Sequence, residues 1–276
     1  MKKIDLSKTT FIIPILIEHK DRYRNAKTTL EYLNHHFKTN VFIYESSSDG
    51  NSKLDFLDSL KDLKIKNWII ETEENFHRTK YLNIMLDLVE TPVVVNYDID
   101  VILSPENYLE SQNLIVNNEA DVVYPYEFGI GQKRVSDKIN LNEFKKSGFD
   151  INYIDSRKEI HDLYNAEYGH CIFFNTGVYR KNGAENENFI SYGPEDRERG
   201  ERFKRLDFRV IWRNGYFVYH FEHYRGNDSS SKNPYFDHNW KIYRDLNELY
   251  EKNSNEYFKF YFSPEYSKKY KNIGNN

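Results

Sequence analysis

The chain has 276 residues, enough to bury a full hydrophobic core as one domain or as two small ones. Its formal net charge of -4 gives no overall basic field, which argues against nucleic acid as a partner. A single cysteine, Cys171, excludes a disulfide framework and is typical of a reducing compartment.

In the first hundred residues, predicted strands alternate with predicted helices. Short and continuously apolar runs predict buried strands at 10–17, 41–44, 68–70 and 91–97. Apolar residues at helical spacing predict helices between them, at 26–37, 54–63 and 78–89. So regular an alternation predicts an α/β fold with a mainly parallel central sheet that is covered on both faces.

The pattern continues for one more helix and strand, at 105–116 and 122–124, and then changes. The region 129–163 is polar, lacks clear periodicity and is long for a connection inside a compact domain, so we interpret it as a functional or mobile loop. Beyond it the sequence predicts a strand at 171–174, a charged helix from about residue 194 and a strand at 216–220. We assign 1–252 to one domain and 253–276 to a peripheral helix or tail.

An acidic tripeptide, Asp98-Ile99-Asp100, directly follows the apolar strand at 91–97. Open α/β proteins bind their ligands at the carboxyl edge of the sheet, and carboxylates there offer hard oxygen ligands to a divalent ion. Such an ion can bridge the protein and a diphosphate. Because Asp-x-Asp arises often by chance, this interpretation needs support from other segments.

Two histidines, His220 and His223, leave the end of a predicted strand three residues apart. In a turn or a bent strand end, this spacing lets both imidazoles converge on one ion. Carboxylate with imidazole suits manganese or a similar first-row metal better than calcium, which prefers oxygen ligands. The alternative is that each histidine caps the strand or bonds locally, because the sequence by itself does not bring either one to Asp100.

The predicted charged helix carries Glu195 and Asp196 in its first turn. The helix dipole favours carboxylates at this end, which keeps them ionised and able to accept a proton. The preceding Tyr192-Gly193, an aromatic residue and a tight turn, is suited to shaping a pocket. We assign the rest of the helix, 197–205, mostly to the solvated surface.

Two basic residues, Arg78 and Lys80, begin the helix that precedes the acidic strand end. Positive charge is unfavourable at a helix N-terminus unless an anion lies nearby. A diphosphate would account for both side chains, and ordinary exposure to solvent is the alternative.

These clusters, in this order along the chain, resemble motifs of the beta-1,4-galactosyltransferase family and its relatives, which include bacterial chondroitin-type polymerases. The similarity extends from about Phe11 to Asp237. The segments that carry it are 13–15, 76–83, 98–100, 192–197 with Arg202 in register, 220–223 and 236–237. Each motif is only moderately specific, but their common order strengthens the resemblance.

The resemblance implies a GT-A fold, the Rossmann-like single domain of nucleotide-diphospho-sugar transferases, with 1–252 as the catalytic domain. The implied activity is metal-dependent, inverting transfer of a hexose from a UDP-sugar to a hydroxyl of a saccharide or glycolipid acceptor. The favoured hexose is galactose or N-acetylgalactosamine. The implied setting is surface polysaccharide or glycolipid synthesis, and the implied cofactor is Mn2+ or Mg2+.

The resemblance also implies a role for each matching residue. The catalytic base would be Asp196. The metal ligands would be Asp100, His220 and His223. The nucleotide-sugar would contact Pro14, Glu45, Arg78 and Asp98. It would also contact Tyr168, in the segment 168–170, which differs from the family pattern and lies near where donor selectivity would be set. The acceptor would contact Tyr192, Glu195 and Arg197.

Three residues depart from the family pattern, with Tyr192 in place of tryptophan, Arg197 in place of an acidic residue and His220 in place of methionine. The first two leave the acceptor open, and an imidazole at 220 is expected to hold a hard metal more tightly. The family's lumenal anchor and disulfides are absent, and no segment is long and apolar enough for a signal peptide or a membrane span. We therefore expect a cytoplasmic location, with at most peripheral membrane association.

Two alternative functions stay open. A nucleotidyltransferase of sugar phosphates also combines an α/β sheet, acidic residues and a divalent metal, but it normally has a Gly-rich phosphate loop after the first strand, and 14–21 contains no glycine. The other alternative is a carbohydrate-binding protein that kept the fold and lost activity. The intact set of acidic residues and histidines argues against that loss.

Overall fold

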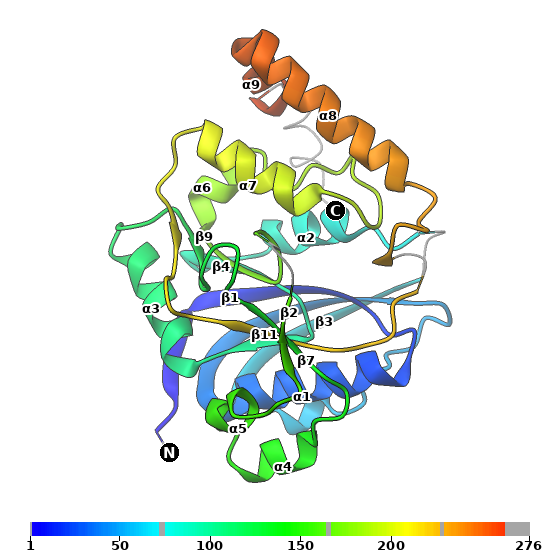
Figure 1. Cartoon of the computed structure of the whole chain (residues 1–276), viewed down its shortest axis with the longest axis vertical. Coiled ribbons are helices and arrows are strands. Elements are labelled where there is room, and N and C mark those ends of the chain that lie inside the picture. Colours follow the sequence, from blue (N-terminus) through cyan, green and yellow to red (C-terminus); the bar gives the residue numbers. More distant parts are fainter. Residues whose placement is uncertain (1, 72–74, 164–166, 227–228, 263–276) are drawn as a thin grey trace.

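The computed structural model describes residues 2–71, 75–163, 167–226 and 229–262, and a twisted seven-stranded sheet lies at its centre (Figure 1). The strands follow one another across the sheet as β10 (Val210–Trp212), β6 (Val122–Tyr124), β9 (Cys171–Asn175), β4 (Val93–Tyr97), β1 (Ile4–Leu16), β2 (Phe37–Ser47) and β3 (Leu63–Glu71). All neighbouring pairs are parallel except those of β9, which runs antiparallel to β4 and β6. Every residue of β4 is buried, which explains its continuously apolar sequence.

Helices lie on both sides of the large sheet. Among the described residues they are α1 (Lys20–His36), α2 (Arg78–Asp87), α3 (Pro105–Val116), α4 (Leu141–Lys146), α5 (Ile151–Asp155), α6 (Thr176–Lys181), α7 (Glu195–Arg205), α8 (Phe236–Lys252) and α9 (Ser254–Phe262), with a 3-10 turn at Leu57–Ser59. In Figure 1, α2, α6 and α7 lie on one side of the sheet and α1 on the other. None of these helices combines the length and the apolar composition that crossing a bilayer requires.

A second, four-stranded sheet positions part of the site. Its order is β5 (Val101–Leu103), β11 (Val218–Phe221), β7 (Gln132–Val135) and β8 (Ile160–Asp162). β11 runs antiparallel to β5, and the register pairs His220 with Val101. Since Val101 follows Asp100 directly, this pairing brings the histidine strand to the acidic end of β4.

The expected α/β class with a mainly parallel central sheet is confirmed. The helix at 105–116 and the strand at 122–124 also form as predicted. The region 129–163 differs from the expected irregular loop, because it contains β7, α4, α5 and β8. These elements have three to six residues each, too few to produce a periodic pattern.

The C-terminal part holds a helix that the sequence analysis did not anticipate, α8, which packs against α9 through a small cluster of Leu246, Tyr257 and Tyr261. The division at residue 252 falls between these two helices and stays a prediction. Of the segment 253–276, residues 263–276 lie outside the described residues.

Candidate active site

The carboxyl edge of the large sheet borders a cavity of about 270 Å³. Asp98 and Asp100 reach it from the end of β4, and Arg78 and Glu195 reach it from the first turns of α2 and α7. Ten of the residues singled out from the sequence line this one cavity, namely Pro14, Arg78, Asp98, Asp100, Tyr168, Tyr192, Glu195, Asp196, His220 and His223. Segments that lie far apart in the sequence, from Pro14 to His223, therefore meet as the motif order suggests.

A carboxylate and two imidazoles form the most compact cluster in the cavity. His223 Nε2 lies 3.1 Å from Asp100 Oδ2, and His220 Nε2 lies 3.5 Å from Asp100 Oδ1. One ligand atom from each of the three residues lies within 4.8 Å of the others. The other ring nitrogen of His223, Nδ1, donates to the carbonyl of Tyr224 at 2.6 Å, which leaves the Nε2 lone pair directed at the cluster.

The protonation states of the cluster suit a metal ion. Burial by itself would raise the pKa of Asp100, but the charges of His220, His223 and Arg22 hold that pKa below its ordinary range. Burial lowers the pKa of His220 to about 3, and the charges of His170 and His223 add to this effect. An ionised carboxylate at position 100 beside a neutral imidazole at position 220 is a combination that binds a first-row divalent ion, so the residues present fit Mn2+.

The second carboxylate of the motif, Asp98, is held from two sides. Arg78 Nη2 donates to Asp98 Oδ1 at 2.8 Å, and His170 Nδ1 lies 3.5 Å from Asp98 Oδ2. His170 Nε2 in turn contacts Gln132 Oε1 at 3.0 Å. Although burial opposes it, the charges of Arg78 and His170 lower the pKa of Asp98, so this carboxylate stays ionised.

The two acidic residues of the first turn of α7 have different surroundings. Glu195 is buried, and its pKa is raised well above the ordinary value by burial and by the charge of Asp196, although Arg78 opposes this shift. Arg78 Nη1 lies 4.0 Å from Glu195 Oε1. Asp196 is half-buried and also lines the cavity. The buried carboxyl group of Glu195, which favours the protonated form, therefore lies beside the more exposed carboxyl group of Asp196.

Gly169 leaves the space that Asp196 occupies. A Cβ at this position would lie 2.5 Å from Asp196 Oδ2, and the backbone φ of +100° also disfavours any side chain. The carbonyl of Gly169 accepts a hydrogen bond from Tyr126 Oη at 2.9 Å, which fixes the turn. The backbone therefore comes close to the carboxylate at this point.

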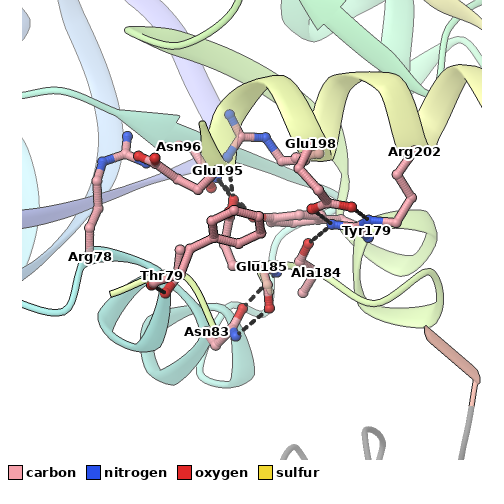
Figure 2. Close-up of polar contacts among 12 residues, drawn as sticks. Arg78, Thr79, Asn83, Asn96, Tyr179, Ala184, Glu185, Glu195, Glu198 and Arg202 are labelled. Carbon is pink, nitrogen blue, oxygen red and sulfur yellow. Dashed lines mark hydrogen bonds and ion pairs between the residues drawn. The ribbon is translucent and has the colours of Figure 1, made fainter. Parts of the chain in front are cut away.

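The rest of α7 is not the solvated surface that the sequence analysis expected. Glu198, Arg199 and Arg202 are buried and form ion pairs, Arg199 with Glu185 at 2.6 Å and Arg202 with Glu198 at 2.9 Å. Figure 2 shows Glu198 and Arg202 directed at each other, with Asn83, Asn96 and Tyr179 around Glu185. The assignment of 197–205 to the surface is wrong because paired charges were not recognised as an internal network.

Two residues predicted to bind ligands lie elsewhere. The buried carboxylate of Glu45 accepts hydrogen bonds from Ser52 Oγ at 2.7 Å and from the backbone N–H of Lys53 at 2.6 Å, and so closes a turn after β2. Arg197 lies 3.6 Å from Glu167. Neither Glu45 nor Arg197 is among the described residues that line the cavity.

The cavity also contains residues that the sequence analysis did not single out. Arg22, in the first turn of α1, lies with Nη1 3.6 Å from Asp100 Oδ2, and Arg225 and His170 line the same space. An arginine near the start of a helix that follows the first strand is a weak signal. His170 stands two positions after Tyr168, which is expected to contact the nucleotide-sugar.

No family model and no curated protein matches the chain. Among solved structures, S. aureus TarS in complex with UDP-GlcNAc is similar with a TM-score of 0.51 and 15% identity, over 80% of this chain and 60% of that chain. GalNAc-T7 with UDP, GalNAc and Mn2+ has a TM-score of 0.56 and 12% identity, over 86% of this chain and 47% of that chain.

The catalytic domain of Drosophila beta-1,4-galactosyltransferase 7 in complex with xylobiose is similar over 75% of this chain and 65% of that chain, at 11% identity and a TM-score of 0.40. That score is too low to support a specific relation to galactosyltransferases, which stays a prediction. The chain thus spans between 47% and 65% of the length of the three structures. At this level of identity TarS and GalNAc-T7 show the fold alone, and this chain has the GT-A fold of nucleotide-sugar glycosyltransferases.

Proposed function

We propose that the protein is a metal-dependent, inverting glycosyltransferase that moves a hexose from a UDP-sugar to a saccharide or glycolipid acceptor. The observation that carries the proposal is the meeting of Asp100, His220 and His223 in a cavity that also holds Arg78 and the carboxyl pair of α7. A site for a divalent ion, a guanidinium and a candidate base within one cavity are the parts that this reaction requires.

Asp100, His220 and His223 would hold Mn2+, with Mg2+ as the alternative. When bound there, the ion would supply Lewis-acid stabilisation of the negative charge that develops on the departing diphosphate. Arg78 would contribute a second positive charge toward that diphosphate, and Asp98, held by Arg78, would receive the ribose or sugar hydroxyls.

On the acceptor side we assign Asp196 as the general base. It removes the proton from the attacking hydroxyl, a contribution typically of about a hundred- to ten-thousandfold in rate. Attack on the face opposite UDP inverts the anomeric carbon. Glu195, whose pKa is raised by burial, would hold a proton and donate a hydrogen bond to the acceptor sugar, and Tyr192 would stack on that sugar.

The donor side is completed by Pro14 and Tyr168, which line the cavity. We propose that Glu45 shapes the turn near uridine. We propose that Arg197 lies where the acceptor enters the site. Galactose or N-acetylgalactosamine is the proposed hexose, and surface polysaccharide or glycolipid synthesis in the cytoplasm, with at most peripheral membrane contact, is the proposed setting.

The test is release of UDP from a panel of UDP-sugars with Mn2+ and a panel of mono-, di- and trisaccharides. We expect release that requires Mn2+, donor and acceptor together, with an inverted linkage in the product. Asp196→Asn should abolish transfer and leave UDP affinity nearly unchanged. Formation of a nucleotide-sugar from a sugar phosphate and UTP would instead identify a nucleotidyltransferase, and binding of saccharides without any turnover would identify a binding protein.

A further inference from the structure

A row of aromatic rings leaves the cavity at its acceptor side and follows helix α8. Tyr192 lines the cavity, and its ring lies nearly parallel to that of Phe236, with an interplanar angle of 10° and 6.2 Å between centroids. Trp240 follows Phe236 at 6.2 Å, and Tyr243 follows Trp240 at 5.6 Å. We call these four residues the α8 aromatic row.

The row is not part of the hydrophobic core of the described residues. Phe236, Trp240 and Tyr243 are half-buried and are packed neither against the core around the large sheet nor against the small cluster between α8 and α9. The α8–α9 contact uses a different set, which includes Leu246, Tyr257 and Tyr261. The contact between α8 and α9 therefore does not account for the row, of which Tyr243 also contacts Glu201 on α7.

Helix α8 is fixed to the loop that leads into the catalytic turn. The fully buried side chain of Asn239 accepts from the N–H of Ile190 at 3.2 Å and donates to the carbonyls of Ile190 and Tyr192 at 2.8 and 3.0 Å. A Cβ at Gly193 would lie 2.7 Å from Asn239, so the loop and the helix touch directly. The row thus has a fixed position relative to Glu195 and Asp196.

The chemistry of the row suits a saccharide chain. Half-exposed rings offer apolar faces to the C–H faces of pyranoses at little cost in side-chain entropy. Beside the row, Glu201 on α7 accepts from Tyr243 Oη at 2.7 Å and supplies a polar group at its far end. The row begins at the cavity, next to the proposed base. A saccharide bound along the row would therefore be continuous with the acceptor sugar that carries the attacking hydroxyl.

We propose that the α8 aromatic row binds the second and third sugar units of an oligosaccharide acceptor, whose first unit lies at Tyr192 and Glu195. The inference rests on the proposed function and narrows it, because it makes a growing saccharide chain the preferred acceptor. Trp240, which contacts neither the donor side nor the reacting atoms, is then a specificity-determining residue for acceptor length.

The experiment compares KM and kcat for mono-, di- and trisaccharide acceptors in the natural protein and in Trp240→Ala. We expect the natural protein to show a KM at least about tenfold lower for the trisaccharide than for the monosaccharide, the equivalent of about 1.4 kcal/mol. Trp240→Ala should remove this gain while leaving the monosaccharide KM, kcat and UDP affinity unchanged, and Trp240→Phe should restore most of it. Tyr153→Ala, which removes a half-buried helical aromatic far from α8, should change none of these values (Figure 1).

A second measurement separates the inference from the proposed function. The chain has three tryptophans, so Trp68→Phe with Trp212→Phe leaves Trp240 as the only one, and its fluorescence is titrated with the same saccharides. A saturable change in Trp240 fluorescence with trisaccharides, without any sugar transfer, would reject the proposed transferase activity and support the row as a saccharide-binding site. Transfer with a KM independent of acceptor length, or an equal rise in KM for all lengths in Trp240→Ala, would reject the row alone. No transfer and no change in fluorescence would reject both.

Discussion

Helix α7 carries charged side chains on two sides. In its first turn, Glu195 and Asp196 face the cavity, where Arg78 Nη1 lies 4.0 Å from Glu195 Oε1. One turn later, Glu198 and Arg202 are buried and paired at 2.9 Å, and Tyr261 Oη also donates to Glu198. The same residue types thus line a cavity on one side of the helix and lie in the interior on the other. On the interior side each charge is paired within the protein.

The largest effect is expected on the buried side of α7. Arg199→Met removes a fully buried guanidinium and leaves Glu185 without its ion-pair partner. Breaking a buried pair in this way typically costs about 3–5 kcal/mol. The free energy of unfolding from urea titration should fall by this amount, whereas Asp196→Asn should change it by less than about 0.5 kcal/mol. Equal losses in the two variants would remove the distinction between the two sides.

On the cavity side, Asp100→Ala should act on binding. It removes the carboxylate that His220 and His223 face. Loss of a residue that only supports a metal ligand typically lowers metal affinity by roughly tenfold or more. Since Asp100 would itself be a ligand, the Mn2+-dependent affinity for UDP should fall by more than roughly tenfold. Calorimetric titration of UDP with and without Mn2+ measures the change. Asp121→Ala, which removes a carboxylate paired with Arg209 outside the cavity, is the matched control and should leave UDP affinity unaltered.

The two sides of α7 meet at Gly200. A Cβ there would lie 2.3 Å from the ring of Tyr168, which lines the cavity, so Gly200→Ala must displace that ring. We expect UDP-sugar affinity to fall by roughly tenfold, since small misplacements at a site are costly. Stability should change by only about 1 kcal/mol, because alanine's helix propensity offsets part of the crowding. Gly177→Ala in α6, where the nearest atom would be 3.5 Å away, should alter neither property.

The comparison also explains what the sequence could predict. The strand that ends in Asp98 and the helix that begins at Glu195 follow from apolar runs and local spacing, so the carboxylates were placed at the correct edge of the sheet. Motif order suggested that His220 lies beside Asp100, but only the register of β11 on β5 brings it there.

The residues that the sequence analysis missed depend on long-range pairing. His170, directly before β9, approaches Asp98 and contacts Gln132 of β7, which lies in the other sheet. Arg199 looks like any exposed arginine until Glu185 is placed opposite it. Local sequence patterns indicate which side chains share a helix face. They do not indicate which residues of other segments that face contacts. Charged residues were therefore the least predictable part of both the site and the core.

The last prediction concerns the protonation state of Glu195, and its effect depends on pH. Its pKa is raised by burial and by Asp196, so the folded protein disfavours the ionised form that the unfolded chain adopts above its ordinary pKa of about 4.3. The favourable contribution of the neutral form is complete below that pH and is lost as pH rises through the folded-state pKa. Glu195→Gln should therefore leave stability unchanged below about pH 4 and increase it near neutral pH, by about 1.4 kcal/mol for each unit of difference between the two pKa values.

Glu198→Gln gives the opposite sign, because this carboxylate is paired with Arg202 and accepts from Tyr261. Replacing the carboxylate of Glu198 by an amide should lower the free energy of unfolding at neutral pH, because the buried guanidinium of Arg202 then loses its ion-pair partner. Denaturant titrations of both variants at pH 4 and pH 7.5 measure the two slopes. A Glu195→Gln variant that is less stable at pH 7.5 would mean that Glu195 is ionised and paired like Glu198. The cavity side of α7 would then lose the neutral carboxyl group that we assign to the acceptor.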